Sequence, residues 1–285
     1  LEDLISEATW GISHPLGRSI TGTNDSLKSF QRNDVLRFFQ AGYCGANTII
    51  SVAGNIDHNQ VTKQVADIFD SLAIGQAADY EGAIKPLADH RFREESDQEQ
   101  VHVALSFPGV ARHDDRRFAH KLLNVILGEN MSSRLFQELR EQRGLCYEVQ
   151  SDFVSFADTG LIQIYVALNP SHLQSALETI DKIARDLVTN GVSKEELEAA
   201  KAFIVGQSHI SLENTSSQMM WAGECLLFFD DWRDPNLAHS AIEDTTAGQV
   251  HQAAREIFAE RRFASALIGP AESNTVMEKW RSAAV

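Results

Sequence analysis

Two stretches of this chain repeat the same order of elements, and this repeat limits the possible fold more than any other feature. Residues 29–65 and 244–280 align without a gap at a shift of 215 positions. Only four of the 37 aligned pairs are identical, which is close to chance. The stronger signal is that both stretches follow the order helix, strand, glycine, helix, with Gly54 aligned on Gly269. We therefore expect related α+β units about 215 residues apart.

Hydrophobic periodicity places the other elements. Alternating apolar residues predict strands at 47–53, 101–107, 147–156, 161–168 and 263–268. Helical periodicity predicts helices at 1–10, 33–40, 57–71, 115–127, 132–142, 247–258 and 272–281, and two more that begin near Asn169 and Ser193. Asn169 followed by proline is a typical helix start, and Ser193 with Glu196 forms a capping-box pattern.

The same patterns suggest how the units divide the chain. Residues 73–94 combine small residues, one proline and polar residues with weak periodicity, which predicts an interdomain linker. Residues 1–72 then form the C-terminal remnant of a first unit, and residues 95–285 form a complete second unit. On this interpretation roughly 120 residues of the first unit precede Leu1. The expected fold class is α+β, with an antiparallel-rich sheet packed with helices.

Composition excludes several classes of function. The net charge of −15 argues against a nucleic-acid-binding or anionic-membrane-binding surface. No segment has the length of a membrane span. The three cysteines are widely spaced, form no CxxC and are odd in number, which argues against a disulfide framework or a thiolate metal cage. An acidic chain suits a basic peptide ligand, but solubility alone is the more frequent explanation of an acidic surface.

The stretch LGENMSSRLFQELREQRGLCYEV, residues 127–149, carries the candidate site. A predicted helix ends at Gly144, with Arg140 in its last turn and Tyr147 at the start of the next strand. Such a junction can direct a permanent cation and a phenolic hydroxyl to one point. The residues alone also allow a simpler interpretation of this stretch, in which Arg140 complements the helix dipole and Tyr147 packs at the edge of the core.

This stretch resembles the second half of the M16 metallopeptidases, the family of pitrilysin, insulin-degrading enzyme and mitochondrial processing peptidase. Five further segments also fit the pattern of this family, in the right order: HPLGRSITGT, SVAGNID, DTGLIQIYV, GVSKEELEAAK and SLENTSSQM. The resemblance implies that Arg140 and Tyr147, seven positions apart as in the family, hold the backbone of a peptide substrate. Relatives often carry glycines where Glu129 and Asn130 stand, so the loop is expected to be stiffer or reshaped here.

The family's zinc motif, HxxEH with a distal glutamate, is absent from this chain. None of its ten histidines makes HxxEH or HExxH. The resemblance therefore implies zinc in the parent protein with ligands upstream of Leu1, and neither catalytic nor metal-binding residues in this chain. His120, with Asn124 four residues later, occupies roughly the place of the zinc helix, and no metal is expected there.

The resemblance implies that this chain is the C-terminal, substrate-holding part of a zinc-dependent endopeptidase, inactive by itself. The zinc-bearing N-terminal unit would belong to the same chain or to a partner, in a homodimer or heterodimer. An alternative is a non-catalytic M16-like subunit that lends Arg140 and Tyr147 to a catalytic partner or serves a structural role. The compartment, cytoplasmic or periplasmic, stays open.

Two further groups have competing interpretations. Arg134, in the SSRL element, is expected to order its loop rather than to touch the substrate. A cluster of aromatic residues after a long helix is expected to pack in the core, and the alternative is that it forms an interface between the two units. The cluster comprises Trp221, Phe228, Phe229 and Trp232.

Overall fold

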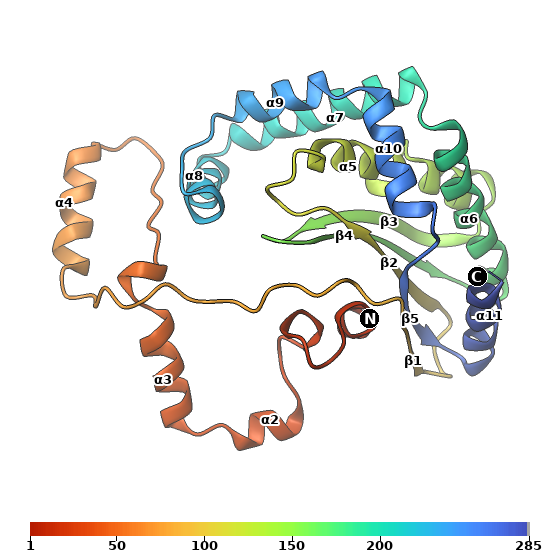
Figure 1. Cartoon of the computed structure of the whole chain (residues 1–285), viewed down its shortest axis with the longest axis horizontal. Helices are drawn as coiled ribbons and strands as arrows, with labels where there is room; N and C mark the ends of the chain where they lie inside the picture. The colour runs from red at the N-terminus through yellow and green to blue at the C-terminus, as the bar shows by residue number, and fades with distance from the viewer. Residues whose placement is uncertain (284–285) are drawn as a thin grey trace. The chain divides into compact units, whose positions relative to one another are not determined.

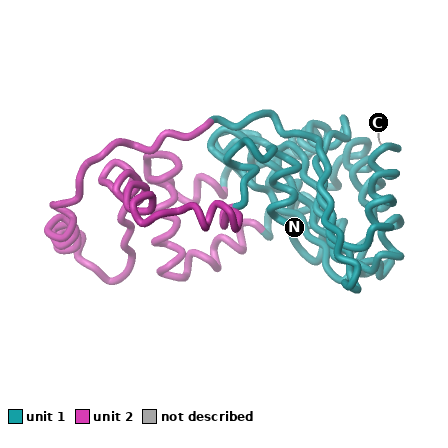
Figure 2. Tube along the Cα trace, turned by 90° about the horizontal axis from the view of Figure 1, so that it is seen from below, with its two compact units in different colours: residues 1–19, 82–203, 240–285 teal, residues 20–81, 204–239 magenta. Residues whose placement is uncertain are grey.

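The protein divides into two compact units in a computed structural model that describes residues 1–283. Unit 1 comprises residues 1–19, 82–203 and the C-terminal part from residue 240, and unit 2 comprises residues 20–81 and 204–239 (Figure 2). Both units are therefore assembled from segments that are distant in sequence. Within the described residues, no helix is both long and apolar enough to cross a membrane.

Unit 1 is built on a mixed five-stranded sheet in the order β1-β5-β2-β4-β3 (Figure 1). Only the pair β1–β5 is parallel, and the other neighbours are antiparallel. The strands are β1 (His90–Glu94), β2 (Val101–Gly109), β3 (Cys146–Ser155), β4 (Gly160–Leu168) and β5 (Ala264–Gly269). β3 is thus an edge strand, and it begins two residues after Gly144.

Helices cover the two faces of this sheet unequally. Small residues of β2 and β5, such as Ala104 and Ala266, face helix α1 (Glu2–Trp10), where Ile5 and Ala8 pack against them. On the opposite face Phe107 meets Phe258 edge to face at 5.0 Å between ring centroids. That face carries α5 (Arg117–Asn124), α6 (Leu173–Asn190), α10 (Ala247–Phe258) and α11 (Ala271–Ser282).

Unit 2 is helical in the described residues. Its elements are α2 (Asn24–Ser29), α3 (Arg32–Gly42), α4 (His58–Phe69) and α8 (Thr215–Phe229), with the 3₁₀ turn η2 (Gly45–Asn47). Helices α7 (Lys194–Leu212) and α9 (Pro235–Asp244) each run from one unit into the other. Many large apolar side chains of unit 2 are exposed, among them Phe38 at 77% and Ile74 at 81%.

Most predicted elements are present, and the α+β fold class is confirmed. The capping box is also confirmed, because Ser193 N–H donates to Glu196 and Glu196 N–H donates to Ser193 Oγ, at 2.8 and 3.1 Å. Asn169 caps the short turn η5 (Pro170–His172) that leads into α6.

Two segments differ from expectation. The prediction of a strand at 47–53 is wrong for this structure, where Asn47 ends the turn η2 and residues 48–53 have no regular secondary structure and belong to no sheet. A strand needs a neighbour to satisfy its backbone groups, and none of the described residues supplies one here. Conversely, residues 90–94, within the predicted linker, form β1. Its polar sequence HRFRE lacks apolar alternation because this edge strand is only half-buried.

Candidate functional site

Arg140 lies in a π-helical turn. The segment η4 (Phe136–Gln142) has the wider i→i+5 bonding of a π-helix, a form often found at functional sites. The turn ends at Gly144, whose φ of +59° favours glycine. Gly144 N–H donates to the Arg140 carbonyl at 3.2 Å, and Leu145 N–H donates to the Leu139 carbonyl at 2.8 Å. These bonds fix the end of the helix and hence the position of Arg140.

The Arg140 side chain is exposed and lies near two aromatic rings. Its Cζ is 5.0 Å from the ring centroid of Phe136, one helical turn earlier, and 6.0 Å from that of Tyr147. Both distances lie within the cation–π range. Arg134 and Arg143 pair with carboxylates, whereas within residues 1–283 no carboxylate lies within 4 Å of the Arg140 guanidinium. Its N–H donors are therefore available to a ligand.

Tyr147 is exposed because β3 begins with a β-bulge. Cys146 pairs with Leu168 and Glu148 pairs with Ala167, so Tyr147 is the extra residue. In a regular strand, successive side chains point to opposite faces of the sheet. The bulge lets Tyr147 and Glu148 both lie outside while Cys146 and Val149 stay buried. Tyr147 is 70% exposed, beside Arg140.

Cys146, which precedes Tyr147, is buried. Burial raises the pKa of the Cys146 thiol to about 11, and the positive charge of Arg140 opposes this rise. The thiol is therefore protonated at neutral pH and is a poor nucleophile. The local chemistry is that of a hydrogen-bond donor pair, Arg140 and Tyr147.

Arg134 ties the loop before η4 to two other helices. Its guanidinium binds Glu196 Oε1 and Asp186 Oδ2, both at 2.7 Å, and donates to the Gly191 carbonyl at 2.9 Å. Burial raises the pKa of Glu196, but hydrogen bonds from Arg134 and Ser193 outweigh this and leave it lowered. These contacts agree with the expectation that Arg134 orders its loop.

Glu129 fixes the other end of the same loop. Both of its carboxylate oxygens lie 2.8 Å from Lys121 Nζ, and one also accepts from Asn124 Nδ2 at 2.8 Å. It ends the π-helical turn η3 (Val125–Glu129), where a Cβ on Gly128 would lie 2.7 Å from Ser151 Oγ. The loop that precedes Arg140 is thus anchored at Glu129 and at Arg134.

Comparison with known proteins identifies the family. A model of the peptidase M16 inactive domain matches residues 29–204, more than half of the chain. The chain belongs to the M16 peptidase family.

Similar proteins agree with this assignment. An uncharacterized zinc protease of Streptomyces coelicolor is 33% identical over 285 residues, which cover 95% of this chain and 60% of that protein. One of Bacillus subtilis is 34% identical over 272 residues, covering 95% and 65%. The solved M16 inactive domain from Pseudomonas fluorescens has a TM-score of 0.84 at 22% identity, covering 95% and 65%, which supports the fold. The chain thus spans less than two thirds of the length of these relatives.

The M16 family implies zinc, but His120 and Asn124, which occupy roughly the place of the zinc helix in this unit, do not fit a zinc ion. His120 is 1% exposed, burial lowers its pKa, and its Nδ1 lies 3.0 Å from the Arg116 carbonyl. Asn124, one turn later, donates its amide to Glu129 and to the Ser151 carbonyl. Across residues 1–283, no three side chains of His, Cys, Asp or Glu form a group that could hold a metal ion.

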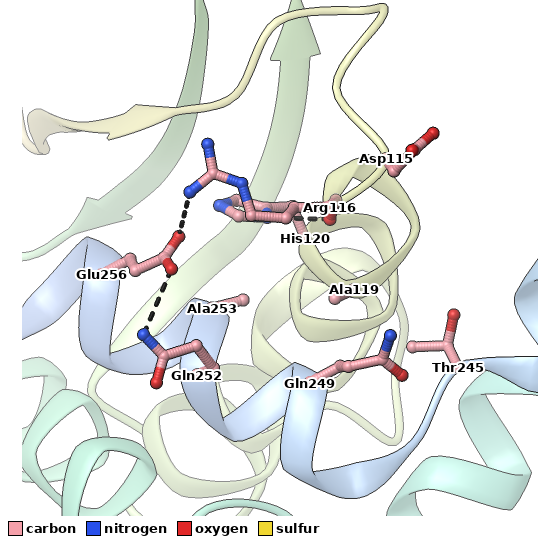
Figure 3. A pocket seen from close by; sticks show the side chains of 9 residues that line it. All are labelled: Asp115, Arg116, Ala119, His120, Thr245, Gln249, Gln252, Ala253 and Glu256. Carbon is pink, nitrogen blue, oxygen red and sulfur yellow. Dashed lines mark hydrogen bonds and ion pairs between the residues drawn. The ribbon is translucent and has the colours of Figure 1, made fainter.

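A cavity of about 170 Å³ lies beside His120, between α5 and α10 (Figure 3). Arg116 lies above it and pairs with Asp114 and with Glu256, at 2.6 and 2.9 Å. Glu256 also accepts from Gln252 Nε2 at 3.2 Å. Each charged group of this cavity has an ionic partner, since Arg116 pairs with Glu256 and Asp115 lies 3.6 Å from Arg117, which is typical of a solvated groove between packed helices.

The structure brings together both residues that the sequence singled out, Arg140 and Tyr147, and their role in substrate binding stays a prediction. Sequence reasoning missed the bulge and the supporting contacts of Asn124. A bulge leaves no mark in composition, but the adjacent polar residues Tyr147 and Glu148 between Cys146 and Val149 break the alternation and could have indicated it.

Proposed function

We propose that this chain is the substrate-holding part of a zinc-dependent M16 endopeptidase, with residues 1–72 as the remnant of a first unit and 95–285 as a complete second unit. The observation that carries the proposal is the unpaired, exposed Arg140 beside the exposed Tyr147. An arginine and a phenol at this spacing can both donate to the carbonyl groups of an extended peptide. Hydrolysis is assigned to a zinc-bearing unit outside this chain.

The two donors would act mainly by fixing the substrate backbone. A positioned carbonyl reacts faster because its orientation is already set when the attack begins. The anchors at Glu129 and Arg134 support this role, since they hold the loop on which the position of Arg140 depends. Preorganised donors contribute more than mobile ones because no reorganisation is needed in the reaction.

The test measures peptide hydrolysis by the full-length protein. Arg140→Ala should lower kcat/KM by about tenfold to a hundredfold, since it removes hydrogen bonds from a charged group. Tyr147→Phe should lower it by about threefold to tenfold, since it removes one neutral donor. Zinc content should not change. Arg143→Ala and the exposed Tyr80→Phe are matched controls and should leave kcat/KM within about twofold of the wild type.

Unchanged kcat/KM in both Arg140→Ala and Tyr147→Phe would rule out the substrate-holding role. Stoichiometric zinc bound by the 285-residue chain alone would contradict the assignment of the metal to another unit. If the full-length protein hydrolyses peptides only after a second M16 chain is added, it is the helper subunit, and the same variants then apply to the mixture.

A further inference from the structure

A histidine from outside the turn holds the backbone between Arg140 and Tyr147. His172 Nδ1 lies 3.1 Å from the Leu145 carbonyl oxygen. A carbonyl oxygen can only accept a hydrogen bond, so Nδ1 carries the proton and donates it. Leu145 lies five residues after Arg140 and two before Tyr147. The histidine therefore binds the segment that sets the distance between the two site residues.

The fold brings His172 to this point because β3 begins where β4 ends. Cys146 pairs with Leu168, so the residues that follow β4 lie beside the start of β3. The turn η5 follows at once. Its first residue, Asn169, accepts from Ser171 N–H with its side chain at 3.0 Å and from His172 N–H with its carbonyl at 2.9 Å. The backbone of His172 is thus fixed before α6 begins.

The other backbone bonds of the turn stay within its own segment. Gly144 N–H donates to the Arg140 carbonyl and Leu145 N–H donates to the Leu139 carbonyl, and both bonds fix the end of η4. Gly144, at a φ of +59°, has more backbone freedom than any other type of residue. The bond from His172 ties the backbone next to this flexible point to another element of the fold.

We propose that His172 is a positioning residue for the candidate site, because its bond to the Leu145 carbonyl holds the Arg140 guanidinium and the Tyr147 phenol at the separation that one bound peptide requires. This inference rests on the proposed function, since it concerns the same two donors. A misplacement of about 1 Å in such a site is enough to lower the rate markedly. His172 acts through the backbone of the turn and does not bind the peptide itself.

Arg143 also reaches α6, but its contacts do not fix the turn. Its Nη1 donates to Thr179 Oγ1 at 3.2 Å, and its Nε lies 3.7 Å from Glu138. These contacts join side chains, and a long arginine side chain has enough rotamer freedom to keep them while the backbone moves. The imidazole of His172 has two side-chain torsions and binds a backbone carbonyl directly. It therefore transmits its own position to the turn.

The place of the donor on the side chain makes the inference specific. An asparagine side chain carries its nitrogen on Cγ, as histidine carries Nδ1, and can donate to the same carbonyl. A glutamine side chain carries its nitrogen one bond farther out, where the imidazole has Nε2. His172→Asn should therefore keep the bond to Leu145, whereas His172→Gln and His172→Ala should lose it.

The first test measures peptide hydrolysis by the full-length protein. His172→Ala and His172→Gln should lower kcat/KM by about threefold to tenfold, as is expected for one neutral hydrogen bond. His172→Asn should stay within about twofold of the wild type. Equal losses in His172→Ala and His172→Asn would overturn the proposal.

His251→Ala is the matched control for the first test. His251 is also half-buried, and its Nε2 donates to the Val188 carbonyl of α6 at 2.8 Å. The variant removes the same kind of bond from the same unit, away from the turn at Leu145. It should leave kcat/KM within about twofold of the wild type. A loss equal to that of His172→Ala would show a general effect on folding and would overturn the proposal.

A second test asks whether His172 acts through the two donors. A variant with both Arg140→Ala and Tyr147→Phe has no donors left to position. His172→Ala added to this variant should change kcat/KM by less than about twofold, because residues that act as a unit are not additive. A further loss as large as the loss in the wild type would overturn the proposal.

Amide hydrogen exchange gives a readout that does not depend on activity. The Leu145 amide should exchange about threefold faster or more in His172→Ala, and at the wild-type rate in His172→Asn. The Gly191 amide, which donates to the Leu187 carbonyl at the end of α6, should exchange at the wild-type rate in both variants. Unchanged exchange at Leu145 in His172→Ala would overturn the proposal.

The outcomes separate this inference from the proposed function. If Arg140→Ala and Tyr147→Phe both leave kcat/KM unchanged, the proposed function fails and the positioning role fails with it. If both variants lower kcat/KM while His172→Ala does not, the two donors hold the substrate as proposed, and only the role of His172 is wrong.

Discussion

The main difference between the two repeated stretches of the chain is a strand that only the second one forms. At the shift of 215 positions, α3 aligns with α10 and α4 with α11, each within a few residues. Gly54 and Gly269 both have positive φ angles, +146° and +159°. Between the helices, however, residues 264–269 form β5, whereas residues 49–54 belong to no sheet.

The difference shows that neighbours, rather than pattern, decide whether an apolar segment becomes a strand. β5 lies between β1 and β2, and Leu267 is fully buried. The aligned Val52 is 47% exposed, and Ile49 and Ile50 are exposed to a similar extent. β-propensity reflects fit to a half-buried, paired surface, so a similarly apolar segment without strand partners forms no strand.

Truncation of aligned side chains gives the largest expected contrast. Leu267→Ala should lower the free energy of unfolding of the 285-residue chain by about 2–5 kcal/mol, because it leaves a cavity in a packed sheet. Val52→Ala should change it by less than about 0.5 kcal/mol, as is usual for exposed positions. Urea denaturation followed by circular dichroism measures both. Equal losses would show that residues 49–54 are packed in solution.

The aligned glycines give an intermediate contrast. An added Cβ at Gly269 would lie 2.8 Å from Val101 Cγ2, whereas at Gly54 it would meet only Thr215 Cγ2 at 3.9 Å. Gly54→Ala should therefore lower the free energy of unfolding by about 1 kcal/mol through backbone strain alone. Gly269→Ala should lower it by about 2–3 kcal/mol, since overpacking adds to the strain. A larger loss at Gly54 would contradict the assigned environments.

The smallest contrast concerns pH. Burial lowers the pKa of His120 in α5, so the folded state keeps its imidazole neutral while the unfolded state takes up a proton below about pH 6.5. Stability should therefore fall as the pH drops from about 6.5 toward the folded pKa. His120→Gln should remove this part of the slope, and His58→Gln, on exposed α4, should not. Thermal melts at pH 7.5, 6.5 and 5.5 measure the dependence of stability on pH. The same dependence in His120→Gln and in the wild type would refute the prediction.

The elements that sequence predicts well are those whose signals are local. The capping box at Ser193, the N-cap at Asn169 and the alternation of β2 all depend on neighbouring residues, and all are present. β1 was missed because its polar residues take strand form only through pairing with β5. The strand at 47–53 was predicted wrongly for the same reason, since its formation depends on partners that the pattern does not reveal.

The candidate site was predictable only in part. The spacing of Arg140 and Tyr147, together with the glycine between them, indicated that they could meet, and they lie 6.0 Å apart, Cζ to ring centroid. The anchors at Glu129 and Arg134 join residues up to 62 positions apart, so sequence spacing could not place them. The contact of His172 with Leu145 follows from the register of β3 on β4, which the sequence alone does not fix.

The bulge at Tyr147 has a consequence for changes in chain length. Removal of Tyr147 alone would leave Cys146, Glu148 and Val149 in regular alternation, with both apolar residues still inside. Removal of Glu148 alone would do the same and keep the phenol. The core should therefore tolerate either single deletion, because the additional residue adds only to the exposed face of β3. It places a hydroxyl and a carboxylate next to each other where an ordinary strand has room for one of them.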